Sequence, residues 1–130
     1  MRWVGIATVV ALAGCGSGIS TEISQQAAAN PERLDLAKVG GAEWERICFL
    51  GPYTNNQEAE KALGFSWNVE VRTDIAKSDG INVLVFVKGK EVVAHTEHPR
   101  HQDFAPLAGQ CFPRESAVFV KGQDGYVHGN

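Results

Sequence analysis

The sequence has 130 residues and a formal net charge of −3 at pH 7, from 12 Lys and Arg residues against 15 Asp and Glu residues. A chain of this length holds one domain. Its hydrophobic content of 44% and charged content of 21% are typical of a globular protein rather than a disordered one. Lys and Arg are scattered, with no basic stripe interleaved with aromatic residues, so the pattern gives no support for nucleic-acid binding.

An uninterrupted apolar segment lies near the N-terminus. Arg2 precedes it, and residues 4–13 read VGIATVVALA. A run of about ten residues is too short for a mature membrane-spanning helix, which needs about 20. It is typical of the apolar region of an export signal. We therefore expect residues 1–14 to be a signal peptide that is removed.

The signal ends in Leu12-Ala13-Gly14-Cys15, which resembles the lipobox of bacterial lipoprotein precursors. The resemblance implies a diacylglyceryl group on the thiol of Cys15, cleavage before Cys15, and acylation of the new amine. Two or more acyl chains hold a protein stably on a membrane. The alternative is an ordinary signal peptide with an incidental cysteine.

The same resemblance implies a location. Gly16 and Ser17 follow the cysteine, and neither is the aspartate associated with retention at the inner membrane. We expect a protein that is lipid-anchored to the cell envelope, in the outer membrane and facing the periplasm.

The remaining chain divides by composition. Residues 15–30 combine the lipidated cysteine with a segment rich in Gly, Ser, Thr, Gln and Ala, which indicates a flexible tether. Fully extended, such a tether reaches about 50 Å. Residues 31–122 are expected to form a single domain, and residues 123–130 a frayed tail.

Two short helices are predicted. Asn30 is a candidate N-cap for a helix over residues 31–39, because the proline that follows it suits the first helical position. Thr54, by its capping-box spacing, and Asn55 compete as the N-cap of a helix over residues 55–63. Each helix is followed by a glycine that ends it.

The strand predictions follow from alternation and from apolar runs. Alternating apolar and polar residues predict strands over 44–49 and 65–71, the latter having the clearest pattern. Residues 81–98 predict a β-hairpin with Gly89 in its turn, and its first strand, apolar on both faces, is expected at the centre of a sheet. A last strand is expected over 116–122. The fold class is therefore α+β, with two short helices packed on a mainly antiparallel sheet of about four to five strands.

Cys48 and Cys111 remain once Cys15 carries lipid. An even pair in an exported protein predicts a disulfide, which would stabilise the fold by about 4 kcal/mol. The alternative is two buried thiols. A redox-active pair is disfavoured because catalytic dithiols usually have Cys-x-x-Cys spacing.

Three histidines, His95, His98 and His101, recur at intervals of three in HTEHPRHQDF. Imidazole and carboxylate groups are what zinc takes in proteins, so this stretch is a candidate zinc site. Pro99 argues against the helix that would align the rings, and on a strand His95 and His98 point to opposite faces. The alternative is a set of solvated histidines at a strand end.

No motif predicts an enzyme. The chain lacks Gly-x-Ser-x-Gly, Ser-x-x-Lys and His-Glu-x-x-His. We therefore predict no catalytic residues and no required cofactor.

Aromatic residues gather near Cys48 and Cys111, and the Gly-Pro and Phe-Pro segments beside them are candidates for a rigid, partly exposed binding surface. Since rigid aromatic and Arg residues are the side chains that binding hot spots use, the candidates are Tyr53, Arg100, Phe112 and Arg114. The alternative is that the rings form the core around the disulfide.

The function indicated by the sequence is a non-catalytic, membrane-anchored lipoprotein that docks an envelope protein or another envelope component. A metal-binding lipoprotein that uses His95, His98 and His101 is one alternative. An inhibitor or exclusion lipoprotein that blocks an incoming enzyme or phage is the other.

Overall fold

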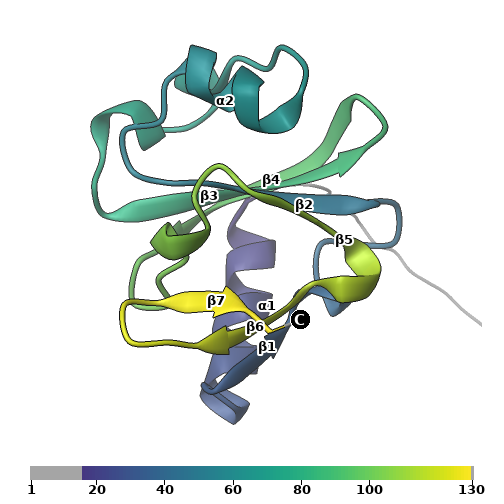
Figure 1. The fold of residues 1–130 in the computed structure, drawn as a ribbon, viewed down its shortest axis with the longest axis vertical. Helices are drawn as coiled ribbons and strands as arrows, with labels where there is room; N and C mark the ends of the chain where they lie inside the picture. Colours follow the sequence, from purple (N-terminus) through teal and green to yellow (C-terminus); the bar gives the residue numbers. More distant parts are fainter. Residues whose placement is uncertain (1–15, 130) are drawn as a thin grey trace, which may run out of the picture.

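The computed structural model describes residues 16–129, so Cys15 and the predicted signal peptide 1–14 lie outside the described residues. Three layers are stacked (Figure 1): a helical layer, a four-stranded sheet, and a lower layer that combines helix α1 with a three-stranded sheet. The predicted α+β class with antiparallel pairing is confirmed, although the strands divide between two sheets.

The middle sheet has the spatial order β4 (Glu91–Pro99), β3 (Ile81–Lys88), β2 (Arg46–Leu50), β5 (Cys111–Pro113), and every neighbouring pair is antiparallel. The predicted hairpin over 81–98 is confirmed as β3 and β4. A glycine in its turn has φ +62°, which residues with a Cβ rarely adopt. β4 and β5 are the edges of this sheet.

The middle sheet is buried on both faces. Along β3, Val83, Val85 and Val87 contact the helical layer, whereas Leu84 and Phe86 contact the lower layer. All five are fully buried. Successive side chains on a strand point to opposite faces, so a run that is apolar throughout suits a strand covered on both sides. The central position predicted for this strand is confirmed.

Helix α2 (Asn56–Leu63) begins and ends as local chemistry dictates, which confirms the helix predicted over 55–63. Asn55 is the N-cap: its side chain accepts from the backbone N–H of Glu58, and the Glu58 carboxylate accepts from the Asn55 N–H. Gly64 ends the helix in the left-handed region, with φ +87°.

The strand predicted over 65–71 is wrong. This segment instead leads into a short helix, α3 (Val69–Arg72), whose N-cap Asn68 accepts from the N–H of Val71. Glu70 accepts from the N–H of the first residue of α2, which ties the two helices together. Val71 is therefore 79% exposed, against the alternation that predicted its burial.

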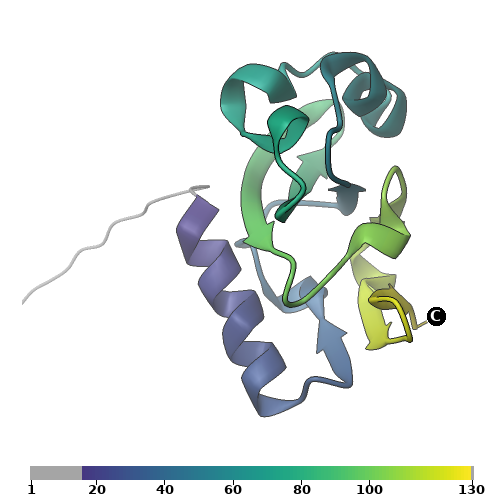
Figure 2. The ribbon, with the colours of Figure 1, turned by 90° about the vertical axis from the view of Figure 1, so that its left-hand side faces the viewer.

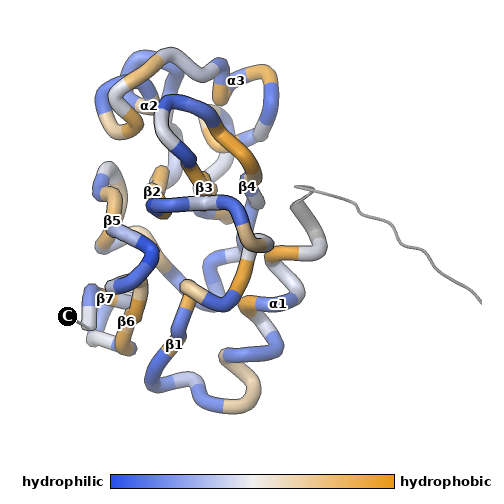
Figure 3. The backbone as a smooth tube through the Cα atoms, turned by 90° about the vertical axis from the view of Figure 1, so that its right-hand side faces the viewer, coloured by the Kyte–Doolittle hydropathy of each residue, from blue (hydrophilic) through white to orange (hydrophobic). Residues whose placement is uncertain are grey.

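Helix α1 (Gly16–Ala29) occupies the segment predicted to be a flexible tether over 16–30, and that prediction is wrong. Ile19, Ile23 and Ala27 are buried in the lower core. They are spaced four apart, which places them on one side of a helix. Figure 2 shows α1 along one side of the molecule, and Figure 3 shows hydrophobic residues recurring along it between polar ones.

A second antiparallel sheet completes the lower layer: β1 (Arg33–Asp35), β6 (Val118–Lys121) and β7 (Tyr126–His128). The helix predicted over 31–39 is wrong, because Leu34 pairs with Phe119 across the sheet and both side chains are fully buried. Asp35 then caps a 3₁₀ turn by accepting from the N–H of Ala37. Within the described residues, 3₁₀ turns connect the elements at η1 (Leu36–Lys38), η2 (Ile75–Lys77), η3 (Ala105–Leu107) and η4 (Arg114–Ser116).

The C-terminal segment 123–130 was expected to fray, and that prediction is also wrong for its described part, because β7 belongs to the sheet. Tyr126 is 3% exposed, and its hydroxyl donates to the carbonyl of Pro31. The folded domain therefore extends from α1 to β7, beyond the predicted limits of 31–122.

Cys48 and Cys111 form a disulfide, as predicted. They are direct partners in the register of β2 and β5, with Cα atoms 4.0 Å apart. The bond fastens the short edge strand β5 to the centre of the sheet. Among the described residues, no helix is long and apolar enough to span a bilayer.

Candidate functional site

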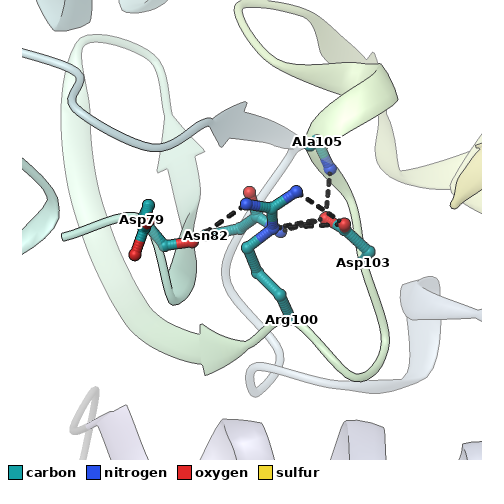
Figure 4. A network of polar contacts seen from close by, with 5 residues as sticks. All are labelled: Asp79, Asn82, Arg100, Asp103 and Ala105. Carbon is teal, nitrogen blue, oxygen red and sulfur yellow. Dashed lines mark hydrogen bonds and ion pairs between the residues drawn. The ribbon is translucent and has the colours of Figure 1, made fainter. Parts of the chain in front are cut away.

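Arg100, one of the predicted binding residues, is held within the fold (Figure 4). Its Nε and Nη2 atoms donate to the carboxylate of Asp103 at 2.8–3.1 Å, and Nη1 donates to the carbonyl of Asp79 at 2.9 Å. Burial alone would raise the pKa of Asp103. Hydrogen bonds from Arg100, the Ala105 N–H and Asn82 outweigh burial, so that this pKa lies below the ordinary carboxyl value. The network fixes the loop after β4.

Arg114 and Phe112 are also engaged internally. The Arg114 guanidinium donates to the carbonyls of Ala37, Gly41 and Trp44 at 2.8–3.2 Å, and it lies 4.4 Å from the centroid of the Trp44 ring. The ring of Phe112 packs against Phe49, Phe119 and His128 in the lower core. Both side chains therefore hold distant segments together.

Tyr53 differs from the other three because its side chain is 59% exposed. Its φ of +68° is the one positive value at a non-glycine residue in the described part of the chain. Such a conformation costs about 1–3 kcal/mol and is typical of functional sites. A hydrogen bond from its N–H to the carbonyl of Ile75 holds the turn in place. A groove of about 560 Å³ adjoins it, lined by Leu50, Gly51, Pro52, Thr54, Glu58, Lys61, Ala62, Ala108 and Gly109.

The three predicted metal ligands do not converge. His98 is fully buried, its Nε2 donating to the amide oxygen of Gln102 at 2.8 Å and its Nδ1 accepting from the hydroxyl of Ser20 at 2.7 Å. The His101 ring lies 5.6 Å from it. His95 points to the other face of β4, beside Trp67. Within residues 16–129, no group of three His, Cys, Asp or Glu side chains is placed to hold a metal ion.

A second groove forms where the segment after α2 crosses the edge strand β4. Its volume is about 420 Å³. It is lined by Phe65, Ser66, Trp67, Arg72, Lys90, Glu91, Val92, Val93, Ala94 and His95. We call it the Trp67 groove. Gly64 turns the chain at the end of α2, and Asn68 starts α3, which fixes the position of the tryptophan between them.

Three aromatic side chains form the body of the Trp67 groove. The rings of Trp67 and His95 meet edge to face, with centroids 5.2 Å apart, and Phe65 is half-buried beside them. Burial lowers the pKa of His95, and the charge of Arg72 lowers it further, whereas Glu97 acts in the opposite direction. The imidazole is therefore neutral at neutral pH.

Two exposed cations border these rings. The Cζ atom of Arg72 lies 6.0 Å from the Trp67 centroid, and Lys90 reaches the groove from the β3–β4 turn. Glu91 is the one acidic residue in the lining, so the groove is locally positive in a chain of net charge −3. In the part of the chain that the structure describes, none of the side-chain polar atoms of Trp67, His95, Arg72 and Lys90 has a hydrogen-bond partner.

The Trp67 groove therefore combines flat apolar surface with unpartnered donors, the composition expected of a site for a small ligand. Sequence reasoning placed His95 in a metal site and Trp67 on a strand, and it did not single out Arg72 or Lys90. Comparison with known protein families, curated proteins and solved structures gives no match to this chain.

Proposed function

We propose that this chain is an envelope lipoprotein, anchored through acylated Cys15 in the outer membrane, whose periplasmic domain is a non-catalytic binding module. The lipobox Leu12-Ala13-Gly14-Cys15 supports the anchoring. The observation that carries the binding role is the Trp67 groove, in which aromatic surface and unpartnered donors converge.

The composition of the groove favours an acidic sugar of the cell envelope. In the proposed complex, the sugar ring stacks on the flat face of Trp67. The C–H groups of the sugar then contact the aromatic surface. A carboxylate on the sugar lies within reach of the Arg72 guanidinium and the Lys90 ammonium, and charge-assisted hydrogen bonds of this kind are about twice as strong as neutral ones. The neutral imidazole of His95 adds a donor and an acceptor.

Fluorescence titration of the purified domain tests this proposal. The probes are N-acetylmuramic acid and N-acetylglucosamine, which share a ring but differ by an acidic side group. We expect the acidic sugar to bind more tightly than the neutral one and to change the emission of Trp67. Trp44 is 2% exposed, so it contributes little to that change. Trp67→Ala removes the fluorescent reporter, so its affinity is measured by titration calorimetry, and it is expected to weaken binding by at least about tenfold, or about 1.4 kcal/mol.

Two further variants sharpen the test. Arg72→Gln removes one cation while keeping a polar side chain, and it is expected to reduce the preference for the acidic sugar. Tyr53→Ala changes the other groove and serves as the matched control, with affinity unchanged. Equal affinity for the two sugars, or loss of binding in the Tyr53 variant alone, would contradict the proposal.

The exposed, strained Tyr53 supports a second candidate role, the docking of an envelope protein at the adjacent groove. A photo-crosslinking residue placed at Tyr53 is expected to capture one dominant envelope protein in cells, and one at Trp67 is not. Capture of the same proteins from both positions would contradict a separate protein site at Tyr53.

A further inference from the structure

Helix α1 begins at Gly16, the residue that follows Cys15 in the chain. Its buried side chains start at Ile19, which is 6% exposed, and continue with the fully buried Ile23. The first residue fixed in the core therefore lies four positions after the cysteine. Even a fully extended chain spans only about 14 Å over that interval.

Polar contacts fasten α1 along its length. Near its start, the Ser20 hydroxyl bonds His98 of β4, and this imidazole has no exposed surface. Near its end, the Gln26 amide donates to the carbonyl of Asp35 at 2.7 Å and accepts from the Asp35 N–H at 2.9 Å. In the middle, Glu22 accepts from the N–H of Gly40. A helix held at these points cannot act as a flexible linker.

We propose that the folded domain is seated directly on the bilayer, with the end of α1 that carries Gly16 nearest to the lipid. This inference rests on the proposed acylation of Cys15. Because α1 is part of the core, the anchor and the domain form one rigid unit, and the domain approaches the lipid headgroups from a restricted set of orientations.

The outer surface of α1, from Ser20 onward, is compatible with lipid headgroups. A shallow hollow of about 460 Å³ lies between α1 and the end of β4, lined by Ser20, Thr21, Ser24, Gln25, Ala28, Glu97 and Pro99. Its lining combines the polar side chains of Ser20, Thr21, Ser24, Gln25 and Glu97 with the small apolar Ala28 and Pro99, and no large apolar side chain projects from it. Such a surface suits contact with hydrated headgroups rather than insertion into the acyl layer. Figure 2 shows that β6 and β7 lie on the opposite side of the molecule from α1, and so away from the surface proposed to face the bilayer.

A linker insertion tests the seating. The lipidated protein is purified from membranes and reconstituted into vesicles, with and without a twelve-residue Gly-Ser insertion between Cys15 and Gly16. With Cys15 acylated and Cys48 and Cys111 joined, Glu60→Cys supplies one free thiol on α2 for a fluorescent label. Energy transfer from this label to a headgroup dye then reports the height of the domain.

We expect the parent to show a short distance and restricted rotation of the label. The insertion is expected to lift the domain by about 20 Å, the mean span of such a coil, and to release its rotation. The same insertion placed after Asn130 is the matched control and leaves both readings unchanged.

Two results would overturn the seating, and they are distinguishable. If parent and insertion variant carry acyl groups and give the same distance and rotation, the anchor is right and the seating is wrong. If the intact mass of the purified chain shows no acyl groups, the lipid anchor itself is wrong, and the seating is overturned with it.

Discussion

Ile23→Ala measures directly whether α1 is part of the folded domain. Ile23 is fully buried in the lower core, between its neighbours on the α1 stripe, Ile19 and Ala27. The substitution removes three carbon groups, each contributing about 0.8 kcal/mol when buried. The cavity that remains adds a further cost, so we expect the free energy of unfolding to fall by about 3 kcal/mol.

Urea denaturation of residues 16–130 with the disulfide intact, followed by tryptophan fluorescence, gives this free energy. Gln25→Ala is the matched control, since Gln25 lies on the exposed side of the same helix. We expect the control to change the stability by less than about 0.5 kcal/mol. If Ile23→Ala is as stable as the control, α1 does not pack on the core, and both the fold described for residues 16–29 and the seating are wrong.

Further predictions concern the fold and its pH dependence. Replacing Cys48 and Cys111 by Ala is expected to lower the free energy of unfolding by about 4 kcal/mol in urea titrations, and an unchanged midpoint would refute the stabilising role. Arg114→Ala is expected to lower the free energy of unfolding by about 2 kcal/mol, because three carbonyls lose their donor. Arg114→Lys is expected to lower it by a smaller amount, and urea titrations measure both. Burial lowers the pKa of His98, partly offset by its hydrogen bond, so the unfolded chain binds more protons. Stability should therefore fall as the pH drops through about 6.5, less steeply in His98→Gln. Because the pKa of Asp103 is lowered in the folded protein, its carboxylate stabilises the fold fully above the ordinary carboxyl pKa of about 3.9, and this contribution is lost as the pH falls below that value. In acid titrations, Asp103→Asn should lack this part of the loss of stability.

The elements that sequence patterns predicted well are those decided by local chemistry. Asn55 and Gly64 start and end α2 through contacts within one or two turns. The apolar run of β3 needs burial on both faces, and Gly89 supplies the positive φ of the hairpin turn. Capping, turn geometry and hydrophobic periodicity act over a few residues and can be read from a short segment.

The elements that were missed depend on distant partners. Leu34 lies in β1 only because Phe119, far along the chain, offers a neighbouring strand. The stripe of Ile19, Ile23 and Ala27 is sparse among Ser and Gln residues, so that α1 depends on the core it contacts for its stability.

The candidate site was missed for a related reason. Trp67 fits an alternating pattern, but the cap of α3 at Asn68 prevents a strand there. The groove appears only when this segment lies across β4, which brings Trp67 to His95 and places Lys90 at the rim. Residues from two separate segments form it, and spacing along one segment does not reveal such a set.

The most direct test of the proposed lipid anchor is the intact mass of the protein extracted from the membranes of cells that express the full chain. We predict a mature chain that begins at Cys15 and carries a diacylglyceryl group and an additional acyl chain on its amine. A chain that retains residues 1–14, or a processed chain without acyl groups on Cys15, would contradict the lipid anchor.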